Sequence, residues 1–160
     1  GPMICRASTP ISDTDTAQSL TERLAKIGAD LVVDALEHAS ELTCTAQPED
    51  GVTYAEKILK SESPVDWTMS AEEIDRRLRA FTPFPYMTAC FGEEVFKLRA
   101  ARPVAGHGTP GEVLSTNKTL VVACGSGALE CTKLQKAGKP EMPAASFLQC
   151  FPLKPGDVLA

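Results

Sequence analysis

Clusters of lysine and arginine are the residues of this sequence whose spacing could do chemistry, and that chemistry is the binding of anions. Cations placed a few residues apart can neutralise successive RNA phosphates, and each neutralised phosphate releases counterions. For any single lysine the alternative is an ordinary solvated surface position. The clusters are Lys57 with Lys60, then Lys97, Arg99 and Arg102, and then Lys133, Lys136 and Lys139.

The distribution of charge decides where an anion could bind. The chain has 160 residues and a formal net charge of −5, which taken alone argues against a nucleic-acid partner. Residues 1–80 contain 8 Lys and Arg against 15 Asp and Glu, whereas residues 81–160 contain 8 against 6. The second half, together with Lys57 and Lys60, is therefore the part of the chain that can face an anion.

The sequence offers no set of residues for acid–base or metal chemistry. Its two histidines, His38 and His107, have no metal-type partner nearby, so we expect a structural role for both. None of the six cysteines is spaced as C-x-x-C, and we interpret all six as reduced apolar side chains, including Cys124 and Cys131 beside the turn at residues 125–127. We therefore predict no catalytic residue and no metal ligand in this chain.

Aromatic residues near the lysines could stack on bases. They are Tyr54, Trp67, Phe84 and Tyr86. Because Trp67 follows Val65-Asp66 and precedes a capped helix, we interpret it instead as a residue packed in a core or between domains.

Two amphipathic helices are predicted before the second half. Apolar residues recur at steps of three and four over residues 17–40, and residues 12–16 can cap the start of that helix. One short extended segment and this helix cannot bury such a stripe between themselves. The stripe either packs on the second half or lacks its usual partner, and we favour the latter. Ser70 and Glu73 form a capping box for a second helix with Ile74, Leu78 and Phe81 on one face.

The hydrophobic period shortens after Tyr86, which indicates strands. We predict strands at residues 87–91, 95–101, 111–115, 120–123 and 128–135, and a short helix at residues 144–150 before a last segment at 157–160. Five short strands with one helix are compatible with a small Greek-key barrel of OB type, as one candidate among several.

Three ordered blocks of the sequence resemble the methionyl-tRNA formyltransferase family. The first is Thr53-Tyr54-Ala55-x-Lys57-Ile58-x-Lys60 followed by Asp66-Trp67, which resembles that family's linker. Two further blocks resemble its carboxy-terminal domain: Arg79-Ala80-Phe81-x-Pro83-x-Pro85, and Leu134-Gln135-x-Ala137-Gly138-Lys139-x-x-Met142 with Phe147-Leu148. The blocks follow the family's order and spacing and span nearly the whole chain. They therefore indicate the family more strongly than they indicate which molecule accepts the formyl group.

The resemblance selects the OB-type barrel and implies an α+β fragment. Residues 1–46 would be the strand and helix that end a Rossmann-like formyltransferase catalytic domain, residues 47–68 the linker, and residues 69–160 a Greek-key OB-like barrel domain. The catalytic residues would lie upstream of Gly1. We expect Gly1-Pro2-Met3 to be native rather than an expression remnant. The chain is thus expected to be truncated and inactive alone.

The resemblance also implies an activity and a partner. The whole enzyme would transfer a formyl group from 10-formyltetrahydrofolate, bound mostly outside this chain, to the amino group of methionyl-initiator tRNA. Lys57 and Lys60 match linker lysines near the acceptor end of the tRNA. Lys139 matches the first lysine of a Gly-Lys-Lys motif, whose second lysine is Pro140 here. The expected tRNA-binding residues are Lys57, Lys60, Lys97, Arg99, Lys133, Lys136 and Lys139.

The subcellular location is predicted from two kinds of segment that the sequence lacks, and the oligomeric state is considered from the exposed apolar stripe of the helix at residues 17–40. No apolar run approaches the ~20 residues that span a bilayer, and no basic-then-apolar signal segment begins the chain. We therefore expect a cytoplasmic location and no membrane partner. The full-length enzyme is expected to be a monomer, and a crystal or fragment dimer through the exposed helix stays open.

Two other functions stay open at this point. A formyltransferase for a nucleotide-linked amino sugar, or a formyl-folate hydrolase, would share the two-domain plan without needing a basic linker. A stand-alone OB module that binds RNA or a protein is the non-enzymatic alternative. The helix at residues 17–40 argues against that module, because its apolar stripe would then be exposed.

Overall fold

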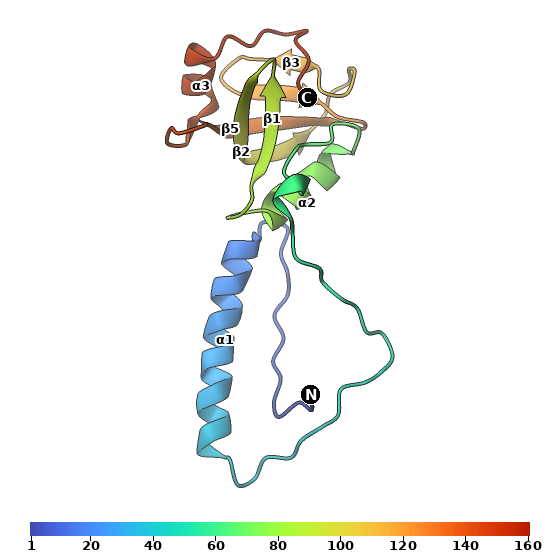
Figure 1. Ribbon diagram of the computed structural model, residues 1–160, viewed down its shortest axis with the longest axis vertical. Coiled ribbons are helices and arrows are strands. Elements are labelled where there is room, and N and C mark those ends of the chain that lie inside the picture. Colours follow the sequence, from blue (N-terminus) through green and yellow to red (C-terminus); the bar gives the residue numbers. More distant parts are fainter. The chain divides into compact units, whose positions relative to one another are not determined.

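The computed structural model describes all of the chain, Gly1–Ala160, as two compact units. Unit 1 is Gly1–Lys57 and unit 2 is Ile58–Ala160. Figure 1 shows one long helix in unit 1 and a curled sheet with short helices in unit 2. No helix in the chain is both long enough and apolar enough to cross a bilayer.

Unit 1 is built around α1, Ala17–Glu37. The helix starts in a capping box, in which Ser19 N–H donates to Thr16 Oγ1 at 3.1 Å and Thr16 N–H donates to Ser19 Oγ at 3.0 Å. The predicted helix extended to residue 40, but α1 ends at Glu37. His38 caps it, donating its N–H to the Asp34 carbonyl, and the chain turns directly afterwards. The expected structural role of His38 is confirmed.

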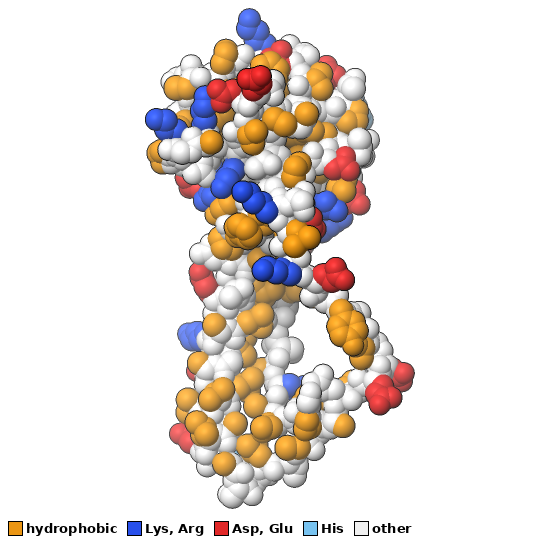
Figure 2. Space-filling model, in the orientation of Figure 1, with side chains coloured by type: hydrophobic (Ala, Val, Ile, Leu, Met, Phe, Trp, Pro, Cys, Tyr) orange, Lys and Arg blue, Asp and Glu red, His pale blue; other side chains and the backbone are white.

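The apolar stripe of α1 is not covered. The helix buries none of its residues, and Leu36 is 73% exposed. Figure 2 shows hydrophobic side chains along the surface of this region. The strand expected within residues 1–46 is absent, and only an isolated bridge joins Met3 to Thr45. The segment has no neighbouring strand in unit 1 with which to form a ladder, so the assignment of residues 1–46 to the end of a catalytic domain stays a prediction.

Two short helices begin unit 2. A single 3₁₀ turn, η1, covers Lys60–Glu62, and α2 covers Ala71–Ala80. The predicted capping box is present, because Glu73 N–H donates to Ser70 Oγ and Ser70 N–H donates to the Glu73 carboxylate at 3.0 Å. The Ser70 N–H and the Ser70 hydroxyl both donate to the Glu73 carboxylate, and these two hydrogen bonds lower its pKa. α2 buries Ile74 and Leu78 against the sheet, chiefly against its second strand.

The sheet of unit 2 is antiparallel throughout. Its strands follow the order β1-β2-β5-β4-β3, with β6 paired to β5. Strand β6 was not predicted, and β2 continues three residues beyond the predicted end at Ala101. The elements are β1 Met87–Phe91, β2 Glu94–Val104, β3 Val113–Ser115, β4 Leu120–Ala123, β5 Ala128–Lys136, β6 Met142–Pro143 and α3 Ala144–Cys150.

The C-terminal segment closes the curled sheet. The two outer strands of the sheet, β1 and β3, do not pair with each other. Instead Ala160 exchanges both backbone hydrogen bonds with Cys90 of β1, at 2.6 and 2.9 Å, while Asp157 accepts from Val113 of β3 at 2.7 Å. One irregular segment thus satisfies the backbone groups of both edges. The α+β class with an OB-like half-barrel after a helix is confirmed.

The core of unit 2 is contiguous. Phe96, Phe147 and Phe151 pack with ring centroids 5.0–5.5 Å apart between β2 and α3. Trp67 is 5% exposed and belongs to the same core, so its predicted packing role is confirmed. The predicted linker at residues 47–68 spans the boundary between the units, and its last residues carry core side chains. The proposed three-part division stays a prediction.

Candidate nucleic-acid interface

Three neighbouring strands bring predicted cations to one outward face of unit 2. In β2 the buried residues Phe96 and Leu98 alternate with the exposed Lys97 and the part-buried Arg99. Lys97 pairs in register with Thr88 of β1 on one side and with Gln135 of β5 on the other. The side chains of β1, β2 and β5 on this face therefore form a polar surface opposite the core.

Tyr86 gives this face an aromatic component. Its ring lies under the Arg99 guanidinium, with 3.6 Å from the ring centroid to Arg99 Cζ, and Lys97 Nζ lies 5.7 Å from the same centroid. Tyr86 N–H donates to the Phe81 carbonyl at 3.0 Å, which holds the residue at the end of the loop after α2. Tyr86 is one of the aromatic residues named from the sequence as able to stack on bases, but its contact with Arg99 was not predicted.

Glu141 organises the centre of the face. Its carboxylate accepts from Arg99 Nε at 2.9 Å and lies 3.6 Å from Lys133 Nζ. Gln135 Oε1 also accepts from Arg99, at 3.4 Å. One carboxylate thus contacts two of the predicted cations, Lys133, which is close to it in the sequence, and Arg99, which is 42 residues away. Lys97 makes no ion pair, so its charge on this face is not neutralised.

The end of β5 carries two further predicted cations. Lys136 Nζ pairs with Glu94 at 3.0 Å and lies 5.7 Å from the centroid of the Phe151 ring. Lys139 is exposed and makes no ion pair, in a tight turn that places Gly138 at φ +70°. Gln135 Nε2 donates to the Lys139 carbonyl at 2.7 Å, which fixes this turn to the outward face.

The linker lysines, Lys57 and Lys60, take part in none of the contacts described above for the cations of unit 2. Lys57 and Lys60 are both exposed and neither makes an ion pair, but Lys57 belongs to unit 1 and Lys60 opens η1 of unit 2. Arg102 is engaged elsewhere, because its Nε donates to Glu130 at 2.5 Å. That bond, with a further one from Thr119, lowers the pKa of Glu130.

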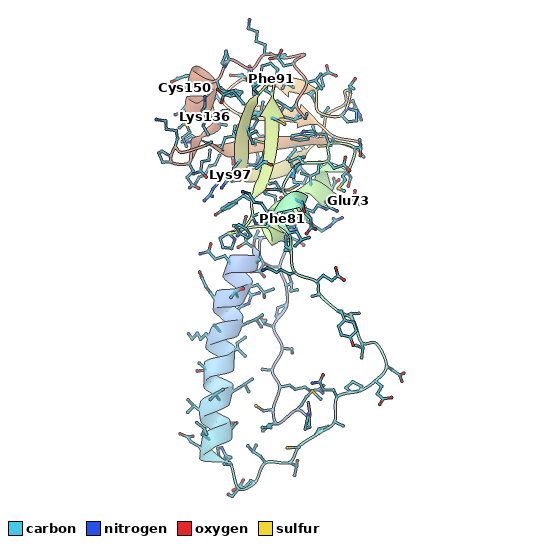
Figure 3. All side chains as sticks on the ribbon, in the orientation of Figure 1. Glu73, Phe81, Phe91, Lys97, Lys136 and Cys150 are labelled. Atoms are coloured by element: carbon cyan, nitrogen blue, oxygen red, sulfur yellow. The ribbon has the colours of Figure 1, made fainter.

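The cationic face is visible in the space-filling view. Figure 2 shows lysine and arginine side chains on unit 2 over the lower part of β1 and β2 and on the side beside α3, with acidic side chains near the upper end of β1. Figure 3 shows Lys97 by β2 and Lys136 beside α3, and the register places the two lysines on opposite faces of the sheet, because Lys136 pairs with the buried Phe96. This arrangement can bind a polyanion, since unpaired cations flank ones that are held in place.

The remaining polar residues do not form a second site. No group of three or more His, Cys, Asp and Glu side chains could hold a metal ion. His107 is exposed in a loop. Burial raises the pKa of Cys124 to about 11 and raises that of Cys131 as well, so both thiols are protonated core side chains, as predicted.

Comparison with known proteins assigns the class first. The family described as formyl transferase, C-terminal domain, matches residues 57–152. The chain therefore belongs to the formyl transferase family through that domain. Its similar relatives are more specific, because the methionyl-tRNA formyltransferases of Dechloromonas aromatica and Ruegeria pomeroyi are each 49% identical to it over 98% of this chain.

The chain spans about half the length of these relatives, 51% in both cases. Crystal structures of HypX from Aquifex aeolicus share the fold at lower identity. One HypX variant aligns with a TM-score of 0.67 at 21% identity, covering 88% of this chain and 27% of that one. HypX in complex with tetrahydrofolic acid aligns with a TM-score of 0.58 at 23% identity, covering 74% and 22%.

Proposed function

We propose that this chain is the C-terminal part of a methionyl-tRNA formyltransferase and that it positions the tRNA. The whole enzyme would move a formyl group from 10-formyltetrahydrofolate to the amino group of methionyl-initiator tRNA. The observation that carries this proposal is the 49% identity to methionyl-tRNA formyltransferases over 98% of the chain. An amino-sugar formyltransferase or a formyl-folate hydrolase is not favoured by these relatives.

The geometry of unit 2 supports a role in holding RNA. Lys97 and Lys139 are exposed without ion pairs, whereas Arg99, Lys133 and Lys136 are held by Glu141 and Glu94. Unpaired lysines are free to neutralise phosphates, and the held cations add a fixed positive field. The Tyr86 ring beneath Arg99 adds a π surface of the kind that binds unstacked bases. Lys57 and Lys60 extend this set in the proposal.

The formyl-transfer chemistry is assigned to the part of the relatives that this chain does not span. The residues described above include no nucleophile next to a base and no metal-binding group. A fold neighbour, HypX, is described in complex with tetrahydrofolic acid. We propose 10-formyltetrahydrofolate as the co-substrate of the whole enzyme, with its site mostly outside this chain, in a cytoplasmic protein that acts as a monomer.

The test of tRNA positioning is the salt dependence of binding. We expect the chain to bind initiator tRNA with an affinity that falls steeply with salt. The combined Lys57→Ala, Lys60→Ala and Lys139→Ala variant should lose affinity at low salt and reduce the slope of log K against log salt by about one per lysine. Lys154→Ala is a single-charge control, since Lys154 is exposed and lies outside the predicted set.

Two outcomes would count against the proposal. Binding that is indifferent to the triple substitution would remove the tRNA-positioning role and favour the amino-sugar or hydrolase relatives. Formyl transfer to methionyl-tRNA by the isolated chain would contradict the division of labour between this part and the rest of the enzyme.

A further inference from the structure

Unit 2 contains a small cavity that the polar face does not use. It lies between the C-terminal end of α3 and the turn that joins β5 to β6, and its volume is about 200 Å³. Figure 3 shows Lys136 and Cys150 on the same side of the unit, beside α3. The lining residues are Lys136, Lys139, Met142, Phe147, Cys150 and Phe151.

The walls of the cavity are apolar and aromatic. Phe147 and Phe151 stack with their centroids 5.0 Å apart and are both held in the core by Phe96, so this wall is preformed. Met142 and Cys150 supply a thioether and a thiol, which adapt to the shape of a ligand. The wall therefore suits a flat, apolar ring.

Two cations, Lys136 and Lys139, line the cavity. Lys136 is tethered to Glu94 at 3.0 Å, whereas Lys139 makes no ion pair. A ligand that places a ring on the phenylalanine wall would bring an attached anion toward Lys139. Small-molecule sites usually enclose roughly 300–1,000 Å³. A cavity of about 200 Å³ thus suits a single ring system rather than a whole cofactor.

The cavity adjoins the cationic face at the turn that carries Lys139. Lys136 follows Gln135 on β5 and therefore points to the opposite face, but Gln135 contacts Arg99 and binds the carbonyl of Lys139, which lines the cavity. A polyanion that follows the face along β5 would therefore arrive at the cavity. We propose that the cavity receives one unstacked nucleotide of the bound RNA, with the base against Phe147 and Phe151 and a phosphate at Lys139. This inference rests on the tRNA-positioning function proposed above.

Cys150 provides a reporter that needs no substitution. It lines the cavity and is exposed, and Cys44 of unit 1 is an exposed control thiol in the same chain. Alkylation of each by iodoacetamide can be followed by peptide mass spectrometry with nucleoside 5′-monophosphates as probes. We expect millimolar nucleotide to slow the reaction of Cys150 several-fold and to leave Cys44 unchanged. Ribose 5-phosphate and inorganic phosphate should give no protection.

Two results of this experiment would overturn the proposal. Equal alkylation rates of Cys150 with and without every nucleotide would show that no base enters the cavity. Equal protection by ribose 5-phosphate would show that the lysines bind phosphate without any contribution from the aromatic wall.

A variant whose cavity is filled by a larger side chain can test this inference independently of the proposed function. Cys150→Trp places a ring in the cavity without changing charge, and Gln149→Trp places the same ring on α3 outside it. We expect Cys150→Trp to weaken tRNA binding at least about fivefold, the lower end of what one base stack contributes. The salt slope should not change, and Gln149→Trp should bind as the unsubstituted chain does.

The outcomes are distinguishable. Salt-sensitive tRNA binding that is equal in both tryptophan variants overturns the nucleotide cavity and leaves the proposed function standing. The absence of salt-sensitive tRNA binding in the unsubstituted chain overturns both. If Cys150→Trp does not fold, as judged by circular dichroism, the protection of Cys150 decides the matter.

Discussion

Unit 1 and unit 2 place comparable kinds of apolar residues in opposite environments. In unit 1 only Asp15 is buried, and Val32, Val33 and Leu36 of α1 are more than half exposed. In unit 2 the buried apolar residues lie between Val65 and Leu159, and all of them except Ala123 and Ala128 form one cluster. Burial of apolar surface is the main favourable contribution to folding, so unit 2 contains the interactions that stabilise it and unit 1 does not.

The comparison shows that an amphipathic pattern predicts which face of a helix is apolar, but does not identify the element that buries this face. Both α1 and α2 carry an apolar stripe, yet α2 buries Ile74 and Leu78 against the sheet while α1 buries nothing. In unit 1 order comes instead from caps and charge pairs at the start of the helix. Substitutions matched between the units can test this difference.

The largest difference is expected from a matched pair of leucines. Leu134→Ala in β5 removes a side chain that is 0% exposed, and we expect it to lower the free energy of unfolding by about 3–5 kcal/mol. Leu36→Ala in α1 removes one that is 73% exposed and should change it by less than about 0.5 kcal/mol. Urea unfolding of both variants is the measurement. A cost for Leu36→Ala similar to that of Leu134→Ala would abolish the contrast.

A second contrast lies in thiol reactivity. Cys5 and Cys44 of unit 1 are exposed, whereas Cys124 is buried with its pKa raised to about 11. At pH 8 such a group is about 0.1% thiolate, against roughly a quarter for an ordinary thiol of pKa ~8.5. We expect the native chain to alkylate at Cys5 and Cys44 at least about 100-fold faster than at Cys124. Denatured protein is the control, and equal rates in the native chain would contradict the burial of Cys124.

Two glycines should respond to alanine with opposite signs. A Cβ at Gly125 of unit 2 would overlap the Thr68 carbonyl oxygen, so Gly125→Ala should lower the free energy of unfolding by about 1–3 kcal/mol. A Cβ at Gly28 of α1 meets no atom within 4 Å, and Gly28→Ala should stabilise the helix by about 0.5–1 kcal/mol. Urea unfolding tests the first change and circular dichroism at 222 nm the second. A loss of helix in Gly28→Ala would show that this position is packed after all.

Elements set by local patterns could be predicted from the sequence, whereas long-range pairings could not. The bounds of β1, β4 and α3 match the prediction because alternation and turn residues determine them locally. The closure of the sheet by Asp157 and Ala160 was not predicted, since it depends on which edges remain unpaired in the folded sheet. Strand β6, with two residues, is too short to carry a period.

The same distinction holds for the candidate site. The positions of Lys97 and Arg99 on one face follow from strand alternation. Their partners do not, because Glu141 is 42 residues from Arg99 and is brought to it by the β5–β6 turn. The contact of Tyr86 with Arg99 likewise depends on the register of β1 and β2. A local pattern places a charge on a surface, but only the fold decides which charges remain unpaired.

The smallest expected effect tests whether unit 1 is ordered by polar contacts. The Asp15 carboxylate accepts from Arg23 at 2.7 Å and from the Ser12 N–H at 2.8 Å. These bonds, the one from Arg23 first, hold the pKa of Asp15 well below its ordinary value of 3.8. Because the folded-state pKa is the lower one, the stabilisation is present above about pH 4 and is lost as the pH falls through the folded value.

Amide exchange at the start of α1 should report this loss. We expect the amides of Ser12 and Ser19 to lose protection only well below pH 4 in the unsubstituted chain, after correction for the intrinsic rate. Asp15→Asn should reduce their protection at pH 6, because an amide cannot replace the carboxylate that Arg23 and Ser12 share. Asp13→Asn, an exposed neighbour, is the control. If Asp15→Asn leaves the protection at pH 6 unchanged, polar contacts do not order unit 1, and the difference between the units is one of burial alone.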